Sequence, residues 1–328
     1  RRLATTEGRT PRTLTETDYL LQVDDEARLG ALRFRESVDG PFLREAVEGR
    51  IPPLVDVGRL LAAADRVADD RDTIDDLKLL LAPGSSLGGA RPKASVRDRD
   101  GALAIAKFPH RDDDWDAVRW EWTALTLARR AGLDVAEARI EAIGERAVLI
   151  VQRFDRVGAH RVPYLSAMSL LGAQDHETRS YLELADALRQ HGAEPDADCR
   201  ALWRRMVFTV LVSNTDDHLR NHGLLLAGPT GWRLSPMFDV NPVPVDVRPR
   251  ELSTAITEHE TTASLALAFN VASHFGVSRA EASAVARDVG AAVATWHEVA
   301  ASAGLSMSAI DRMRSAFEHD DLELALRS

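Results

Sequence analysis

The apolar pattern of this 328-residue chain changes from strand-like to helical partway along its length. Before about residue 155, short apolar runs alternate with turns, which is typical of strands. After residue 166, apolar residues recur at helical spacing, as over residues 178–191 and 199–213. The expected strands cover residues 94–96, 102–108, 136–143 and 147–154. Strands followed by helices favour an α+β fold with a β-rich N-terminal lobe and an all-α C-terminal lobe, divided near residues 155–165.

The composition is that of an ordinary soluble globular protein, with 45% apolar and 28% charged residues. The net charge of −10 argues against a protein that binds nucleic acid over its whole surface. A single cysteine, Cys199, excludes an intramolecular disulfide and fits a reducing cytoplasm. The sequence shows no signal peptide and no apolar run near the roughly 20 residues that a membrane span needs. The chain begins at Arg1 without a methionine, so it can be a fragment or a processed form.

We divide the chain into three segments. Residues 1–84 form an N-terminal segment, residues 85–160 the strand-rich part with a glycine-rich loop, and residues 161–328 the helical part. Within the first segment, residues 19–23 are expected to form a short strand. Helical spacing after Pro52-Pro53 predicts a helix at residues 54–64, and a second helix near residues 73–81 ends at Pro83-Gly84.

A loop crowded with polar side chains lies between two apolar segments within residues 212–239. Asp216 and Asn221 stand in the order D-x-x-x-x-N, and Asp239 follows after a short hairpin with a G-P-T-G turn. In protein kinases an Asp in this place accepts the proton of the substrate hydroxyl, while the Asn and a later Asp hold metal ions. The spacing selects Asp216 rather than Asp217 as the base, because Asn221 stands at the fifth position after Asp216.

Two other interpretations of this loop are open. Asn214, Thr215 and Asp216 can cap a helix and turn the chain without any catalytic role. His218 and His222, four residues apart, can bind zinc if the loop is helical. Gly223 argues against a helix there, and the H-E-x-x-H pattern of metalloproteases is absent from the sequence.

A glycine-rich loop precedes the first expected strand of the second segment, and Lys107 ends the next strand. Glycines let backbone N–H groups approach an anion closely. Kinases cover the nucleotide phosphates with such a loop and pair them with a lysine on a strand. The loop matches neither G-x-G-x-x-G nor the Walker A pattern, so an ordinary turn between strands is the alternative.

Glu121 lies on the apolar stripe of a helix expected over residues 114–130, between Val118 and Leu125. A carboxylate that faces inward needs a partner. Lys107 is the expected partner, as in the Lys–Glu ion pair of kinases. The alternative is a solvated position at the edge of the stripe. The end of the last strand, residues 151–154, is where the adenine-binding hinge falls in a bilobal kinase.

Four stretches together resemble the HipA-like serine/threonine kinases, the toxins of bacterial toxin–antitoxin pairs. They occur in the family's order over residues 85–242 and read S-S-L-G-G-A-R-P-K-A, A-I-A-K-F-P, N-T-D-D-H-L-R-N-H and L-S-P-M-F-D-V-N-P. The resemblance extends over about residues 19–320, and the beginning of the family's N-terminal subdomain is missing or short. The implied fold is bilobal and protein-kinase-like.

The resemblance implies a role for each matching residue. Asp216 is the implied catalytic base, and Asn221 and Asp239 are the implied Mg²⁺ ligands. Ser86 matches the serine that the family autophosphorylates, an event that ejects the glycine-rich loop and inactivates the kinase. The implied ATP-contacting residues are Ser86, Gly88, Gly89, Lys93, Lys107, Glu121, Gln152 and Phe154.

The family suggests an ATP- and Mg²⁺-dependent protein serine kinase whose substrate is a component of translation, such as an aminoacyl-tRNA synthetase. It also implies a HipB-like helix-turn-helix antitoxin as partner, contact with DNA through that complex, and no membrane. Two alternatives are a kinase-like module that acts mainly as co-repressor in an antitoxin–DNA complex and a kinase for a small molecule or lipid. The joint presence of Lys107, Asp216, Asn221 and Asp239 favours an active enzyme.

Overall fold

The chain forms two compact units. The computed structural model describes residues 5, 8, 10, 12–45, 51–84, 91–110 and 113–328, without the side chains of residues 78 and 81–84. Unit 1 comprises Arg1–Asp113 and Arg139–Pro163, and unit 2 comprises Asp114–Ala138 and Tyr164–Ser328. No helix among the described residues has the length and apolar character that crossing a bilayer requires.

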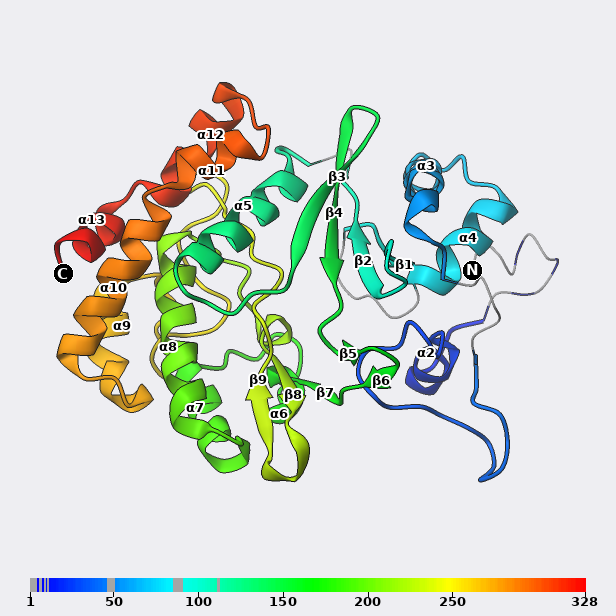
Figure 1. Ribbon diagram of the computed structural model, residues 1–328, viewed down its shortest axis with the longest axis horizontal. Helices are drawn as coiled ribbons and strands as arrows, with labels where there is room; N and C mark the ends of the chain where they lie inside the picture. The colour runs from blue at the N-terminus through cyan, green and yellow to red at the C-terminus, as the bar shows by residue number, and fades with distance from the viewer. Residues whose placement is uncertain are drawn as a thin grey trace. The chain divides into compact units, whose positions relative to one another are not determined.

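An antiparallel sheet forms the centre of unit 1, with its strands in the order β1 (Lys93–Arg97), β2 (Leu103–Lys107), β4 (Arg146–Gln152) and β3 (Ala138–Ile143) (Figure 1). The turn between β1 and β2 closes because Asp98 N donates to Ala102 O at 2.8 Å and Gly101 adopts a φ of 84°. Glycine reaches that left-handed conformation without strain. The strands expected from the apolar runs are confirmed, with ends shifted by two residues at most.

The helices η1 (Leu54–Asp56), α3 (Val57–Ala68) and α4 (Ile74–Gly84) belong to the same unit. The apolar stripe predicted for the first helix is buried, with Leu60 and Leu61 at 1% exposure or less. These leucines pack in one cluster with the sheet residues Val96, Ala104 and Ile150. Burial of this stripe against the sheet is the main stabilising contribution from α3, since each buried aliphatic side chain contributes about 2 kcal/mol.

The strand expected over residues 19–23 is wrong, because this part of the chain forms the helix α2 (Glu16–Gln22). Thr15 caps the helix: its hydroxyl accepts from Asp18 N, and the Asp18 carboxylate accepts from Thr15 N at 2.9 Å. This capping box outweighs the strand preference of the short apolar run that follows it. Farther along unit 1, β5 (Arg156–Val157) and β6 (His160–Arg161) form a small antiparallel hairpin.

Unit 2 is mainly helical (Figure 1). Its described helices are α5 (Ala117–Arg130), α6 (Ala167–Leu170), α7 (Tyr181–His191), α8 (Pro195–Leu211), α9 (Leu265–Val271), α10 (Arg279–Val293), α11 (Trp296–Ser302), α12 (Met307–Phe317) and α13 (Asp320–Arg327), with the 3-10 turns η2 (Leu219–Asn221), η3 (Gly228–Thr230) and η4 (Ala272–Phe275). Helix α8 starts earlier than expected because Pro195 occupies the first helical position, where a missing N–H is harmless. The aromatic core includes Trp296 stacked on Phe317, with ring centroids 4.7 Å apart.

A small sheet accompanies the helices of unit 2, with β8 (Gly223–Leu226) between β7 (Tyr164–Ser166) and β9 (Trp232–Leu234). The hairpin expected around the G-P-T-G turn is β8–β9. Strand β7 was not expected from the sequence, and it approaches β8 so closely that a Cβ on Gly223 would meet the Tyr164 ring at 2.5 Å. The α+β class is confirmed, and its helical part also carries these strands.

The neutral ring of His319 makes the stability of unit 2 sensitive to acid. His319 caps α13: its Nδ1 accepts from Leu322 N at 3.3 Å, and its Nε2 lies 3.2 Å from Leu211 O. Burial, aided by the nearby positive Arg250, lowers the pKa of His319 to about 4. Between that value and the ordinary pKa of about 6.5, the unfolded chain binds more protons than the folded protein. The stabilisation is therefore complete above about pH 6.5 and is lost as the pH falls toward about 4.

We expect His319→Asn, which keeps a capping side chain, to flatten this pH dependence. Between about pH 7 and about pH 5, the unfolding free energy of the unmodified protein should fall by about 2 kcal/mol more than that of the variant. Urea denaturation at both pH values measures the difference. Equal losses in the two proteins would show that His319 is not the group that titrates.

Candidate active site

The polar loop predicted to carry the catalytic base leaves the end of α8 through a strained turn. Ser213 has a φ of 50°, a left-handed conformation that is uncommon outside glycine. After this turn Asp216 is exposed, with 59% of its side chain accessible, whereas the side chain of Asp217 is only 3% accessible. An exposed carboxylate can meet a substrate and a buried one cannot. The difference in burial therefore favours Asp216 over Asp217 as the base, as the spacing predicts.

The buried Asp217 holds the loop in place through its hydrogen bonds. Its carboxylate accepts from the hydroxyl of Tyr181, and His222 Nε2 lies 3.2 Å away. Its backbone oxygen accepts from Thr254 Oγ1 at 2.6 Å. Burial alone would raise the pKa of Asp217, but its contacts with His222 and Tyr181 hold the pKa below the ordinary value. The carboxylate is thus charged and satisfied, and it anchors the loop to α7 and to residue 254.

Asn221 bonds back to the predicted base. Its Nδ2 donates to Asp216 O at 3.1 Å, and its backbone N donates to His218 O at 2.8 Å. Asn221 is 7% exposed, so its side chain has little freedom to turn. Because Nδ2 is used in this bond, Oδ1 is the atom that remains for a ligand. The predicted base and the first predicted metal ligand are therefore held together in one short turn.

The segment that carries Asp239 is hydrogen-bonded to the same loop. Asn241 N donates to Asn214 Oδ1 at 3.1 Å, and Val243 N donates to Ser213 O at 3.2 Å. Asp239 itself has a φ of 57°, a left-handed backbone that costs a residue with a Cβ about 1 kcal/mol or more. Strain of this kind concentrates at functional sites. Asp239 thus lies two residues before Asn241, which is bonded to the loop, and its backbone carries a conformational cost that a plain connection does not require.

The donor atoms of Asn221 and Asp239 fit Mg²⁺, which prefers hard oxygen ligands. Among the described residues, no three His, Cys, Asp or Glu side chains are grouped closely enough to hold a metal ion. Mg²⁺ in phosphoryl-transfer sites takes only one or two protein ligands and completes its shell with phosphate and water. A pair of oxygen donors is therefore the set that such a site needs.

The zinc interpretation is not favoured by the positions of the two histidines. His222 is 2% exposed, its Nε2 faces Asp217, and its ring packs edge-on against Tyr181 with centroids 5.4 Å apart. His218 Nδ1 is buried and has no hydrogen-bond partner among the described residues. Among the described residues, no group of three potential metal ligands includes either histidine.

A feature that the sequence did not indicate is a basic residue beside the predicted base. Arg248 Nη1 lies 3.7 Å from Asp216 Oδ1, and both side chains are about half exposed. Solvent weakens such a pair. The contact still shows that the Asp216 carboxylate points out of the loop, where a polar group such as the Arg248 guanidinium can approach it.

The predicted phosphate contacts of unit 1 lie on two neighbouring strands. Lys93 on β1 and Lys107 on β2 are direct cross-strand partners. Residues directly opposite each other in an antiparallel pair point to the same face of the sheet, so the two lysines share one face. Ser86, Gly88 and Gly89 of the glycine-rich loop lie outside the described residues. Their predicted contacts with ATP stay predictions.

Glu121 and the hinge residues complete the predicted set. Glu121 is 4% exposed on α5, so the solvated-edge alternative does not describe it. Its pairing with Lys107 stays a prediction. Gln152 ends β4, opposite Ala104 of β2, and Phe154 follows two residues later; both are partly buried. Their proposed contact with adenine is likewise untested.

The sequence did not indicate that Asp217 is an anchor, or that Tyr181 and Thr254 are its partners. They lie 36 and 37 residues from Asp217 along the chain, so no local spacing connects them. One signal was available in the doubled aspartate followed by His222, because a buried carboxylate needs a polar partner and a nearby histidine can supply one.

The family model for the HipA-like C-terminal domain matches residues 85–296. The chain belongs to this family. Among curated proteins, the HipA-like chain is 27% identical over 182 residues to "Putative kinase Y4mE" of Sinorhizobium fredii, and 27% identical over 169 residues to a "Putative kinase" of Haemophilus influenzae. The matches cover 47% and 46% of this chain, and 41% and 49% of the two relatives. The chain thus spans less than half the length of these relatives.

Two solved structures resemble the fold of the HipA-like chain. One is from Shewanella oneidensis MR-1, where the HipA and HipB proteins of a toxin–antitoxin system form a complex with operator DNA. The match has a TM-score of 0.57 at 16% identity and covers 81% of this chain and 70% of the other. The second is the proinflammatory kinase CtkA of Helicobacter pylori, with a TM-score of 0.53 at 15% identity, covering 74% of this chain and 92% of the other. At these identities the likeness concerns the fold.

Proposed function

We propose that this protein is an ATP-dependent protein serine/threonine kinase. The observation that carries the proposal is the arrangement around the loop after α8. Asp216 is exposed, Asn221 is bonded to it, and the segment of Asp239 is bonded to the start of the same loop. These groups follow one another along the chain in the order of the base and the metal ligands of protein kinases. Membership of the HipA-like family and the kinase names of the relatives support the same activity.

The roles of the residues follow from their chemistry. Asp216 Oδ accepts the proton of the substrate hydroxyl and orients that oxygen toward the γ-phosphate. Asn221 Oδ1 and the Asp239 carboxylate would hold Mg²⁺, which neutralises charge on the phosphates when it is bound. Lys93 and Lys107, paired where β1 begins and β2 ends, contact the phosphates, and residues 152–154 contact adenine.

The proposed biological role is that of a toxin in a toxin–antitoxin pair. The fold resembles a HipA protein that was solved with HipB and operator DNA, which favours a HipB-like helix-turn-helix partner for this chain. DNA would be contacted through that complex, since the net charge of this chain is −10. The protein substrate is proposed to be a component of translation, such as an aminoacyl-tRNA synthetase.

Radiolabelled ATP with the purified protein and Mg²⁺ tests the activity. We expect label to enter the protein on Ser86 and the label to be absent from Asp216→Ala. Tight ATP binding without any transfer, in the presence of candidate protein substrates, would instead point to the kinase-like co-repressor. Transfer to a small molecule or lipid but to no protein would point to the third function.

Replacing Asp239 by Asn tests its role as a metal ligand. Asn tolerates the left-handed backbone as well as Asp does, so the fold should keep its melting temperature. Loss of the carboxylate should weaken Mg²⁺-dependent ATP binding by about tenfold or more, as measured by calorimetry with and without Mg²⁺. Unchanged affinity in Mg²⁺ would show that Asp239 does not hold the metal.

A further inference from the structure

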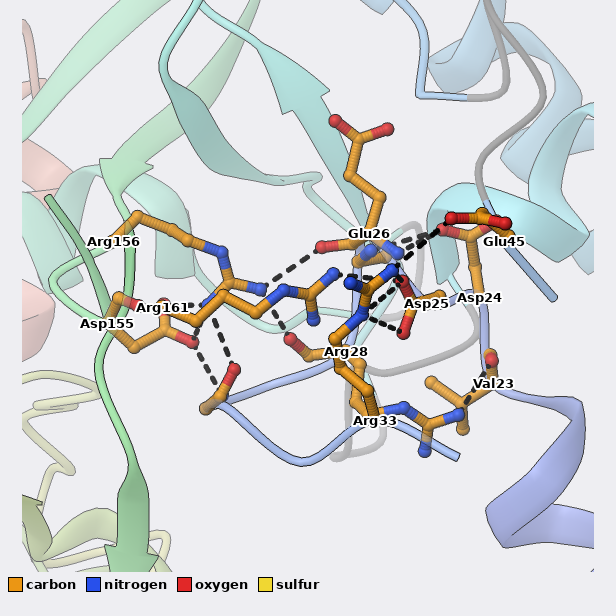
Figure 2. A network of polar contacts seen from close by, with 12 residues as sticks. Val23, Asp24, Asp25, Glu26, Arg28, Arg33, Glu45, Asp155, Arg156 and Arg161 are labelled. Carbon is orange, nitrogen blue, oxygen red and sulfur yellow. Dashed lines mark hydrogen bonds and ion pairs between the residues drawn. The ribbon is translucent and has the colours of Figure 1, made fainter. Parts of the chain in front are cut away.

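A buried network of arginines and aspartates joins two segments of unit 1 that are about 125 residues apart in sequence. One is the turn at residues 24–30, and the other follows β4 at residues 153–161. Figure 2 shows Arg156 and Arg161 extending from the second segment toward the turn that contains Asp25 and Glu26. The second segment begins directly after Gln152 and includes Phe154, the residues predicted to contact adenine.

Arg153 and Asp155 form the centre of the network. Arg153 Nε donates to Asp155 Oδ1 at 2.7 Å and Nη2 donates to Asp155 Oδ2 at 2.5 Å, with both side chains 1% accessible. The guanidinium also donates to Ala27 O at 2.8 Å and to Arg28 O at 3.1 Å. Asp155 Oδ2 in turn accepts from Gly30 N at 2.7 Å. The pair is thus satisfied by the backbone of the 24–30 turn.

Arg156, which follows Phe154 in the sequence, also binds the 24–30 turn. It donates to Glu26 O at 3.2 Å, to Arg28 O at 2.7 Å and to Gly30 O at 3.2 Å. Gly30 has a φ of 72°, which bends the chain so that its N–H and C=O both meet the network. Burial lowers the pKa of Arg156 to about 10, so the group keeps its charge at neutral pH. Phe154 therefore lies between two anchored residues.

The outer part of the network holds the turn itself. Asp25 accepts from Arg33 Nη2 at 2.6 Å and from Arg161 Nη2 at 3.1 Å. Arg28 donates to Leu20 O at 2.9 Å and Val23 O at 3.0 Å at the end of α2. These bonds hold the turn in place as a support for residues 153–156.

This network is better suited to fixing a geometry than to adding stability. Buried ion pairs stabilise a fold little compared with apolar side chains of similar size, because desolvating the charges offsets their attraction. They do fix one geometry, since each guanidinium fork accepts few arrangements of oxygen atoms. A network of this kind is best suited to holding a main-chain segment in a single conformation.

We propose that Arg153, Asp155 and Arg156 are positioning residues that hold the adenine-contacting segment 152–154 in its binding conformation, with the 24–30 turn as their support. This inference rests on the proposed function. It predicts that nucleotide affinity depends on the hydrogen bonds that Arg153 and Arg156 donate to backbone carbonyls of the 24–30 turn. The chemical step depends on the loop of unit 2 and should not depend on them.

Arg156→Lys tests the inference, since it keeps the charge and removes the fork. We expect KM for ATP to rise about tenfold while kcat changes less than about twofold. The matched control is Arg99→Lys, a surface arginine of the same unit that pairs with Glu141, with 73% of its side chain accessible. Both parameters should stay unchanged in the control. A folded Arg156→Lys protein with the KM of the unmodified enzyme would overturn the inference.

Hydrogen exchange in the unmodified protein gives a second test that does not depend on a variant folding. Addition of a non-hydrolysable ATP analogue should slow amide exchange in residues 152–156 and in residues 24–30 together. Protection of residues 152–156 without any change in residues 24–30 would contradict the inference while leaving the kinase proposal standing. Failure of the unmodified protein to bind ATP at all would overturn both.

Discussion

Asn in place of Asp216 should remove phosphotransfer while leaving the protein folded and able to bind ATP. The side chain is 59% accessible, so the change costs the fold little. The carboxylate supplies the proton acceptor, and loss of a general base lowers kcat by about 10²- to 10⁴-fold. Steady-state transfer from ATP to a protein substrate measures the loss, and calorimetry checks that the affinity for ATP is kept.

Asp175→Asn provides the control for this change. Asp175 is another exposed aspartate of unit 2 that meets an arginine, here Arg220, with 63% of its side chain accessible. It has no place in the proposed mechanism, and its removal should leave kcat unchanged. If Asp216→Asn retained the activity of the control, Asp216 would not be the base and the assignment of the loop would be wrong.

The neighbouring Asp217 should behave in the opposite way. Asp217→Ala leaves the Tyr181 hydroxyl and His222 Nε2 buried without the acceptor that both now contact. Each orphaned group costs about 1–3 kcal/mol, so the unfolding free energy should drop by about 3 kcal/mol or more. Activity should fall as well, because the loop that carries Asp216 and Asn221 loses its inner anchor.

Tyr181→Phe separates the parts of this effect. It removes one hydrogen bond and keeps the ring, so we expect a loss of about 1 kcal/mol in urea denaturation. The unfolding free energy should fall most in Asp217→Ala and less in Tyr181→Phe. It should hardly change in Asp216→Asn. An Asp217→Ala protein as stable as Asp216→Asn would show that the buried carboxylate does not hold the loop.

Local patterns predicted most of the fold because they reflect local physics. The apolar stripe of α3 and the short apolar runs of β1, β2 and β4 are buried as their periodicities indicate. The strand expected near Tyr19 failed for a local reason as well. The capping pair Thr15 and Asp18 was present in the sequence, and it fixes a helix that the apolar run alone does not reveal.

The candidate site was predictable only where spacing along the chain encodes it. Asp216 and Asn221 lie within one turn, so their order is visible in the sequence. The contacts of Asp217 with Tyr181, and of Arg153 with the 24–30 turn, join residues 36 and more than 120 positions apart. Such contacts depend on how helices and strands pack, and neither composition nor periodicity specifies them.

The most direct test of the account is a crystal structure of this protein with Mg²⁺ and a non-hydrolysable ATP analogue. We predict a metal ion at about 2.1 Å from both Asn221 Oδ1 and a carboxylate oxygen of Asp239. The γ-phosphate should face Asp216, and Lys107 should contact the phosphates. A nucleotide bound elsewhere, or a metal ion that touches neither Asn221 nor Asp239, would contradict the kinase assignment.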